Sequence, residues 1–591
     1  MWWPGNEAGP VEVKGADGKL VEGEAGMGVW RRRFEEAGVA EVEGVGSVGV
    51  RAPYEARDGP PNAVEVGAAV SALKMGKAAG PDGVATAMLR KGGLVWWLVK
   101  LFDGVWTAGK VPCEWKRALL VPVYKKGDVN DPANYRGISL MVVAAKVLER
   151  VVLNRIRGDR EVRSREEQAG FRAGRSCGEQ VFALRLMLQE RAEWGLPVAV
   201  VALDFKAAYD SVDRGSLWRV LEAEGMGPST LAVLRSLGEK TEAAVRVGGK
   251  VGEWFPVERG VRQGSVVSPV LFGAVMDWLM RRAISEVEGV GVVLGGGPRL
   301  ADLDYADDVL GVAESVEALQ RLVDAVDRVG RRIGMELNPK KVEWMANKLV
   351  PAGVLKVCGV DLERKSSLVY LGSLVDAEGG CAAEVARRVA VASASFGRLR
   401  GLWRSREVSL EVKVAVYRAV VRGVMLYGSE TWASRAADVS RLSVFERRCA
   451  REMMGVSWRD RVSNVALCTR TGLGDVGSEL VTRRWRWLGH VLRMGEMRIP
   501  RRWLLQEGLS MGGVRKQGEA RLTWMRCVMR EGWNGVPWKE LKVRKPLWKR
   551  WCDGGWRPFM LDLAGDRDSW RSVVDAVARQ FSSSARPSRV G

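Results

Sequence analysis

Two stretches decide the fold, LADLDYADDVLGVAES (residues 300–315) and PVAVVALDFKAAYDSVDR (residues 197–214). In the first, apolar residues flank Tyr-Ala-Asp-Asp, which predicts a β-hairpin with Asp307 and Asp308 at its tip. In the second, the apolar, β-branched run 198–203 predicts a buried central strand that ends at Asp204. Three carboxylates would therefore be fixed by rigid strands at one edge of a core.

The chemistry of these acids points to divalent ions. A bare Asp-Asp pair usually belongs to a solvated loop, but here a Tyr precedes it and apolar strands flank it. Phosphodiester synthesis uses two hard cations about 3.5–4 Å apart, and Mg²⁺ prefers oxygen ligands such as carboxylates. The nearby Asp210 and Asp213 are expected to be surface residues or caps of the next helix.

The charge of the chain favours a polyanionic partner. Its 591 residues are 47% hydrophobic and carry a net charge of +21, with a pI near 9.8. A basic protein without such a partner is the alternative. Residues 481–591 hold 24 Lys and Arg against 10 Asp and Glu, together with 10 of the 25 Trp. Basic and aromatic residues together suit nucleic acid, although each single Trp is expected to fill a helix core.

Other site classes lack support in the sequence. The eight Cys contain no C-x-x-C pair and the only His is His490, so no zinc knuckle is predicted. No apolar run approaches the roughly 18–20 residues of a membrane-spanning helix, and the N-terminus lacks the features of a secretory signal. A membrane partner and secretion are therefore not expected.

The apolar patterns predict an α+β region followed by helices. From 115 to 375, short β-rich runs alternate with helical patterns. After about 380, apolar residues recur at three and four positions, which predicts helices over 384–403 and 410–428. Residues 1–60 show little periodicity apart from one amphipathic piece at 29–39.

Eight segments together carry a family resemblance. The acid-bearing strand and the hairpin are accompanied, in one order along the chain, by segments at 74–90, 115–140, 167–181, 260–279, 334–345 and 370–380. Over roughly 70–480 the chain resembles the reverse transcriptases of non-LTR (LINE-type) retrotransposons. This resemblance implies an RNA-directed DNA polymerase that uses an RNA template, a DNA primer or RNA–DNA hybrid, dNTPs and two Mg²⁺ ions, with Mn²⁺ as an alternative.

The resemblance also implies an α+β right-hand polymerase, with fingers, a palm built on an antiparallel sheet, a helical thumb and a basic helical C-terminal region. The expected parts are a linker or partly disordered segment (1–60), a helical extension of the fingers (61–112), fingers and palm (113–378), a thumb-like region (379–480) and the basic Trp- and Arg-rich region (481–591).

Residue roles follow from the same resemblance. Asp204, Asp307 and Asp308 would be the catalytic, metal-binding triad. The expected nucleotide-binding residues are Phe205 through its carbonyl, Tyr209 as a gate against the ribose 2′-hydroxyl, Gln263, Gly264, Arg136 and Lys341. Lys125 or Lys126 could join Arg136, and Lys340 competes with Lys341 for its role. Tyr370, Leu371 and Gly372 would grip the primer end, with packing as the alternative.

Several readings stay open. Ala207 stands where many relatives have Lys, and no segment matches the endonuclease that usually precedes such a polymerase, so the chain is expected to be the polymerase portion of a longer element. A catalytically inactive, nucleic-acid-binding relic is the alternative function. An RNA-dependent RNA polymerase is disfavoured by Tyr209, and telomerase or intron-encoded polymerases by the segments at 74–90 and 427–432. The nucleus is the location expected from the resemblance, and the oligomeric state stays open.

Overall fold

A five-stranded sheet carries the acid-bearing strands in the computed structural model, which describes residues 12–15, 17–35, 44–45, 49–293, 298–505, 522–535 and 556–584. Its order is β10-β11-β5-β12-β15, antiparallel except for the β12–β15 pair. The strands are β10 (Asp302–Tyr305), β11 (Asp308–Ala313), β5 (Ala199–Leu203), β12 (Glu343–Ala346) and β15 (Arg364–Lys365). The predicted central strand and hairpin are both confirmed.

Helices cover both faces of this sheet, which is why β5 is apolar throughout. Ala199, Val201 and Leu203 lie in one core with residues of α10 (Ser268–Ser285) and α11 (Val316–Arg331). Val200, on the opposite face, lies in a second core with residues of α6 (Cys177–Glu193). Burial on both faces is the environment in which a strand tolerates a continuous apolar run.

A second sheet, of order β4-β3-β6-β7, lies in the part of the chain that is expected to form the fingers. It consists of β3 (Arg117–Tyr124), β4 (Tyr135–Met141), β6 (Thr241–Val247) and β7 (Lys250–Val257). Helix α1 (Gly23–Glu35) packs on it through Trp30, which is 1% exposed and lies 5.0 Å edge-to-face from Tyr135. Part of the 1–60 segment, expected to be a linker, is thus a packed helix; residues 1–11, 16, 36–43 and 46–48 lie outside the described residues.

Further helices fill the space behind the two sheets and share the first core. They are α2 (Ala63–Ser71), α3 (Thr86–Lys91), α4 (Val95–Ala108), α5 (Val143–Arg163), α7 (Ala208–Ser211), α8 (Arg214–Ala223) and α9 (Pro228–Gly238). Asp213 caps α8 by accepting a hydrogen bond from the amide of Ser216 (2.6 Å), as predicted.

Helices dominate after residue 380, as the apolar spacing predicts. They are α12 (Ala382–Arg398), α13 (Arg400–Arg404), α14 (Leu410–Val416), a π-helical turn (Tyr417–Arg422), α15 (Gly423–Met425), α16 (Ala436–Met454) and α17 (Asn464–Thr471). Phe396, Tyr417 and Phe445 contribute to a core that these helices share. This core is separate from the two that enclose the β5 sheet, so the helices form a distinct thumb-like layer.

The C-terminal helices share a core with α6. They are α18 (Val476–Leu492), α19 (Ile499–Leu505), α20 (Trp524–Gly535), α22 (Trp556–Gly565) and α23 (Arg567–Ser584). Trp485, Trp503, Trp524 and Trp570 are at most 3% exposed and join the α6 core. The expectation that single Trp residues fill helix cores is confirmed for these four.

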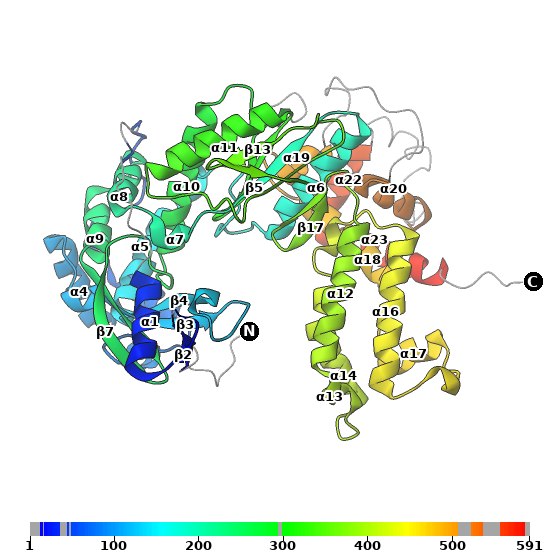
Figure 1. Ribbon diagram of the computed structural model, residues 1–591, viewed down its shortest axis with the longest axis horizontal. Helices are drawn as coiled ribbons and strands as arrows, with labels where there is room; N and C mark the ends of the chain where they lie inside the picture. The colour runs from blue at the N-terminus through cyan, green and yellow to red at the C-terminus, as the bar shows by residue number, and fades with distance from the viewer. Residues whose placement is uncertain are drawn as a thin grey trace, which may run out of the picture.

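The elements are arranged as an arch (Figure 1). The α10 and α11 layer and the β5 sheet lie at the top, the fingers elements descend on one side, and α12, α14 and α16 descend on the other. Within the described residues, none of the helices combines the length and apolar character that crossing a membrane requires.

Candidate active site

The three predicted acids come together at one end of the β5 sheet. Leu203 of β5 pairs with Val309 of β11, so Asp204 and Asp308 follow at adjoining positions on neighbouring strands. Tyr305 pairs with Asp308, which leaves Ala306 and Asp307 as a two-residue turn. The register alone therefore brings these three residues, from two distant segments of the chain, to one edge of the sheet.

Partial burial and nearby negative charge perturb these acids. Asp307 and Asp308 are exposed, yet the protein atoms around them remove enough water to raise the pKa of both carboxyl groups. Partial burial is the main cause for Asp308, the charges of Asp307 and Asp204 add to it, and its pKa rises to about 6. A bound cation would relieve this repulsion, so the electrostatics suit a divalent ion.

Cations from the fingers and the palm face the acids. Lys341 Nζ lies 3.1 Å from the Asp204 carboxylate, which distinguishes it from Lys340. Burial lowers the pKa of Lys125, and the charges of Arg136 and Lys341 lower it further. Arg136 and Lys125 in turn oppose the pKa rise of Asp307 and Asp308. The predicted triphosphate contacts are thus gathered near the acids, and their roles remain predictions.

The three acids have the ligand chemistry that a hard metal ion requires, but their side chains do not converge on one point. Their donor atoms are all carboxylate oxygens, the ligand type that Mg²⁺ prefers. Among the described residues, however, no three His, Cys, Asp or Glu side chains converge as ligands around one point. One carboxylate oxygen of Asp204, Oδ2, is paired with Lys341.

Tyr209 and its aromatic neighbours form a wall beside the acids. The Tyr209 ring stacks on Phe272 with centroids 4.2 Å apart, and Phe171 meets it edge-on at 6.3 Å. The hydroxyl is buried without a hydrogen-bond partner, and burial, followed by the charge of Asp307, raises its pKa. Phe171, 53% exposed with a positive φ of 58°, was given no role by the sequence reading. Its only signal there was its place in the 167–181 segment.

Phe205 continues β5 past Asp204. Its side chain is 5% exposed and belongs to the core, and the residue bridges antiparallel to Leu337. The amide of Asn338 donates to the carbonyl of Asp204 (2.8 Å), which fixes the backbone on that side. The metal contact expected of the Phe205 carbonyl remains a prediction.

Gln263 and Gly264 both make close contacts with other segments of the chain. Gln263 Nε2 donates to both carboxylate oxygens of Asp210 at 3.1 Å. Asp210 was expected on the surface or as a cap; instead it is half-buried and burial raises its pKa. Gly264 has φ +129°, and a Cβ there would come within 2.5 Å of the Ser139 carbonyl oxygen. The absence of a side chain at Gly264 thus allows its backbone to approach strand β4 closely.

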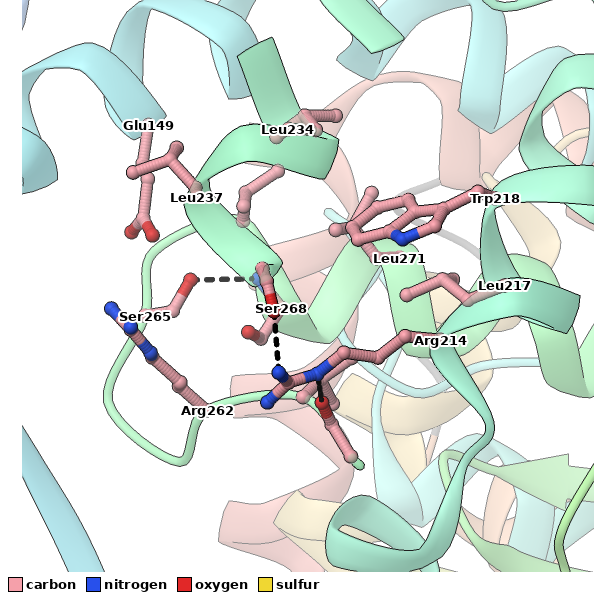
Figure 2. Close-up of a pocket in the computed structure, with 14 residues that line it drawn as sticks. Glu149, Arg214, Leu217, Trp218, Leu234, Leu237, Arg262, Ser265, Ser268 and Leu271 are labelled. Carbon is pink, nitrogen blue, oxygen red and sulfur yellow. Dashed lines mark hydrogen bonds between the residues drawn. The ribbon is translucent and has the colours of Figure 1, made fainter. Parts of the chain in front are cut away.

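Arg262 and Ser265, on either side of Gln263 and Gly264, line a cavity of about 40 Å³ (Figure 2). The buried Glu149 carboxylate accepts a hydrogen bond from the amide of Val266 (2.8 Å), and its pKa is raised by burial. Arg262 donates to the carbonyl of Trp115 (3.0 Å), and the amide of Ser268 donates to Ser265 Oγ. None of the three acids lines this cavity, so the cavity is not the site at which those acids would bind a metal.

Residues 370–372 form a tight hairpin turn between β16 (Ser367–Tyr370) and β17 (Ser373–Asp376). Leu371 and Gly372 both have positive φ, 47° and 76°, the signature of a two-residue turn whose twist matches its strands. Tyr370 donates to the carbonyl of Leu303 on β10 (2.8 Å). Arg388 of α12 donates to the Gly372 carbonyl, so this turn joins the palm to the thumb-like helices. Its contact with a primer remains a prediction.

Comparison with known proteins agrees with this geometry. Residues 123–375 match the family described as reverse transcriptase (RNA-dependent DNA polymerase). The Pol polyprotein of retrotransposable element R2 from Nasonia vitripennis is 28% identical over 49% of this chain and 27% of its own length. The polymerase of mobile element jockey from Drosophila melanogaster is 25% identical over 68% of this chain and 44% of its own length.

Two further similarities are weaker or shorter. The R2 polyprotein of Popillia japonica is 31% identical over 39% of this chain and 32% of its own length. An apo telomerase structure from Candida tropicalis gives a TM-score of 0.32 at 12% identity, over 46% of this chain and 55% of that one, which is too low to carry an argument. The chain spans less than half the length of these curated relatives. Residues 123–375 of the chain thus match a reverse transcriptase domain, and these curated relatives come from non-LTR retrotransposons.

Proposed function

We propose that this chain is an RNA-directed DNA polymerase that extends a primer 3′-hydroxyl with deoxynucleotides on an RNA template. One observation carries the proposal: Asp204 and Asp308 lie on adjoining strands beside Asp307, and they face Lys125, Arg136 and Lys341. Clustered acids beside clustered cations suit a metal-bound triphosphate.

Each side chain near the acids would have its own role in the reaction. Asp204, Asp307 and Asp308 would hold two Mg²⁺ ions, with Mn²⁺ as an alternative; bound there, the ions would activate the hydroxyl and neutralise phosphate charge. Lys341 would exchange its contact with Asp204 for one with the triphosphate, beside Arg136 and Lys125. The Tyr209 ring, fixed on Phe272, would exclude a 2′-hydroxyl, and the turn at 371–372 would hold the primer end.

The partners proposed are an RNA template, a DNA primer or RNA–DNA hybrid, and dNTPs. The net charge of +21 supports a polyanionic partner, and counterion release predicts that binding to the hybrid weakens steeply as salt increases. Nuclear location remains a proposal from the family resemblance.

A catalytically inactive, nucleic-acid-binding chain is the second candidate function. The observation that favours it is the Lys341–Asp204 contact, together with the lack of a converged ligand group among the residues described. In that case Lys341 would neutralise Asp204 permanently and no metal would enter.

Primer extension separates the two candidates. The wild-type chain, a DNA primer annealed to an RNA template, dNTPs and Mg²⁺ should give extended product, whereas Asp307→Ala should give none and still bind the hybrid. Asp361→Asn, an exposed carboxylate on β14 (Val360–Leu362), is the matched control and should extend normally. Hybrid binding without extension by the wild type, across several templates and with Mg²⁺ or Mn²⁺, would favour the inactive chain.

A further inference from the structure

The turn that carries Asp307 is built on a strained residue. Ala306 has φ +61°, in the left-handed region that residues with a Cβ avoid. Asp307 is the next residue of the same two-residue turn, and Asp308 begins the following strand. A strained conformation of this kind persists only where the surrounding structure determines it. The hairpin pairing favours this conformation, and one neighbouring side chain contacts Ala306 from both sides.

The side chain of Gln168 holds both sides of this residue. Its Oε1 accepts a hydrogen bond from the amide of Ala306 (2.8 Å), and its Nε2 donates to the carbonyl of Ala306 (3.2 Å). The same Oε1 also accepts from the amide of Gly170 (2.7 Å). Gln168 is 2% exposed, so water cannot easily replace these bonds.

The segment that contains Gln168 is itself anchored along the edge strand of the sheet. Gln168 bridges parallel to Asp304 of β10, and the amide of Ala169 donates to the Asp304 carbonyl (2.9 Å). Gln180 of α6 donates to the carbonyls of Glu167 (2.6 Å) and Asp304 (2.9 Å). A Cβ at Gly170 would overlap the backbone nitrogen of Ala306, so only glycine allows this approach.

We propose that Gln168 is a positioning residue, which clamps the Ala306–Asp307 turn and thereby orients Asp307 and Asp308 for the reaction. This inference rests on the proposed polymerase function. The side chain of Gln168 hydrogen-bonds backbone groups, so it acts through the backbone of Ala306. Without the clamp, the turn relaxes from positive φ, and the two carboxylates leave their register with Asp204.

The kinetic test uses a loss and a second-site rescue. Gln168→Ala should lower kcat by about 10- to 100-fold, as a small misplacement of catalytic groups does, while the KM for dNTP and hybrid binding change little. Ala306→Gly in the same chain should restore most of kcat, because glycine adopts positive φ without support. A residue that only stabilised the fold would lower Tm and would not be rescued by this glycine.

The matched control is Gln189→Ala. Gln189 is also a buried glutamine that hydrogen-bonds backbone groups, those of Gly379 and Trp524, but it lies away from the turn. Its loss should lower Tm and leave kcat unchanged. Equal kcat values for Gln168→Ala and wild type, or a kcat loss that Ala306→Gly does not reverse, would overturn the inference.

Hydrogen exchange tests whether Gln168 holds the turn, and this test does not depend on activity. Peptides that cover 303–309 should exchange faster in Gln168→Ala, by about tenfold or more, because local opening costs less there; Gln189→Ala should leave them unchanged. If the wild type extends no primer, the proposed function fails while this measurement still tests the clamp. Unchanged exchange at the turn in Gln168→Ala would overturn it.

Discussion

The acidic hairpin tip and the Trp- and Arg-rich C-terminal helices both concentrate polar and charged side chains, but the fold satisfies them differently. Asp307 and Asp308 are exposed, crowded by like charge and raised in pKa. Arg484 is 2% exposed and is paired with Glu531, which also accepts a hydrogen bond from the Trp485 indole (3.2 Å). One region holds charge in an unfavourable state, and the other pairs its buried Arg484 with a carboxylate.

This difference separates function from stability. Buried polar groups normally find partners, because an unpaired one costs free energy. Crowded carboxylates lower stability unless a ligand offsets their repulsion, and such arrangements occur at functional sites. The hairpin tip therefore suits cation binding, while the C-terminal cluster contributes to the stability of the fold.

The largest expected effect is on stability. Trp485→Ala removes a fully buried ring from the α6 core and leaves Glu531 with one donor fewer. We expect the free energy of unfolding to decrease by about 3–5 kcal/mol, while kcat per folded molecule stays at the wild-type value. Chemical denaturation and active-site titration measure the two quantities. A loss of kcat in fully folded Trp485→Ala would contradict the claim that the C-terminal cluster contributes to stability and not to catalysis.

The second effect concerns sugar discrimination by Tyr209. Replacing its ring by a smaller side chain, in Tyr209→Val, should raise incorporation of ribonucleotides relative to deoxynucleotides by about 10- to 100-fold. Tyr209→Phe keeps the ring and removes a buried, unpartnered hydroxyl, so it should retain discrimination and lose no stability. Relaxed discrimination in Tyr209→Phe would place the selectivity in the hydroxyl instead of the ring.

The third effect is the pH dependence of extension. Only the ionised form of Asp308 can hold a metal, and its pKa in the folded chain is about 6. Below that pH, kcat/KM should fall by about tenfold per pH unit, and higher Mg²⁺ concentrations should move the midpoint to lower pH. If the midpoint does not respond to Mg²⁺, the group that titrates is not a ligand of the metal.

The smallest effect is a gain in stability on removing one acid. The folded pKa of Asp308 lies above its ordinary value of 3.8, so ionisation between about pH 4 and 6 lowers the stability of the metal-free fold. Asp308→Asn should therefore have a slightly higher Tm than the wild type at pH 7 without metal, and the difference should vanish near pH 4. A lower Tm for Asp308→Asn at pH 7 would contradict the raised pKa of Asp308.

The α+β region, the helices after it and the positions of the three acids follow from local patterns in the sequence. An apolar run that ends in Asp204, and a hairpin that ends in Asp307 and Asp308, are each recognisable within about ten residues. The helices after residue 380 are predicted by apolar spacing for the same reason. Such features need no knowledge of distant contacts.

What could not be predicted depends on contacts between distant segments. Asp210 is half-buried because Gln263 donates to it, and α1 is a packed helix because Trp30 meets Tyr135 on β4. Gln168 gains its role from Ala306, 138 positions away. In each case the residue type is compatible with several environments, and only the tertiary pairing selects one.

The central claim is that the hairpin acids bind divalent ions, and the Mg²⁺ dependence of Tm tests it most directly, because a ligand of the native state raises Tm. Wild type and Trp485→Ala should both gain Tm as Mg²⁺ is added, whereas the double variant Asp307→Asn with Asp308→Asn should gain none. An equal Mg²⁺-dependent gain in the double variant would contradict the claim.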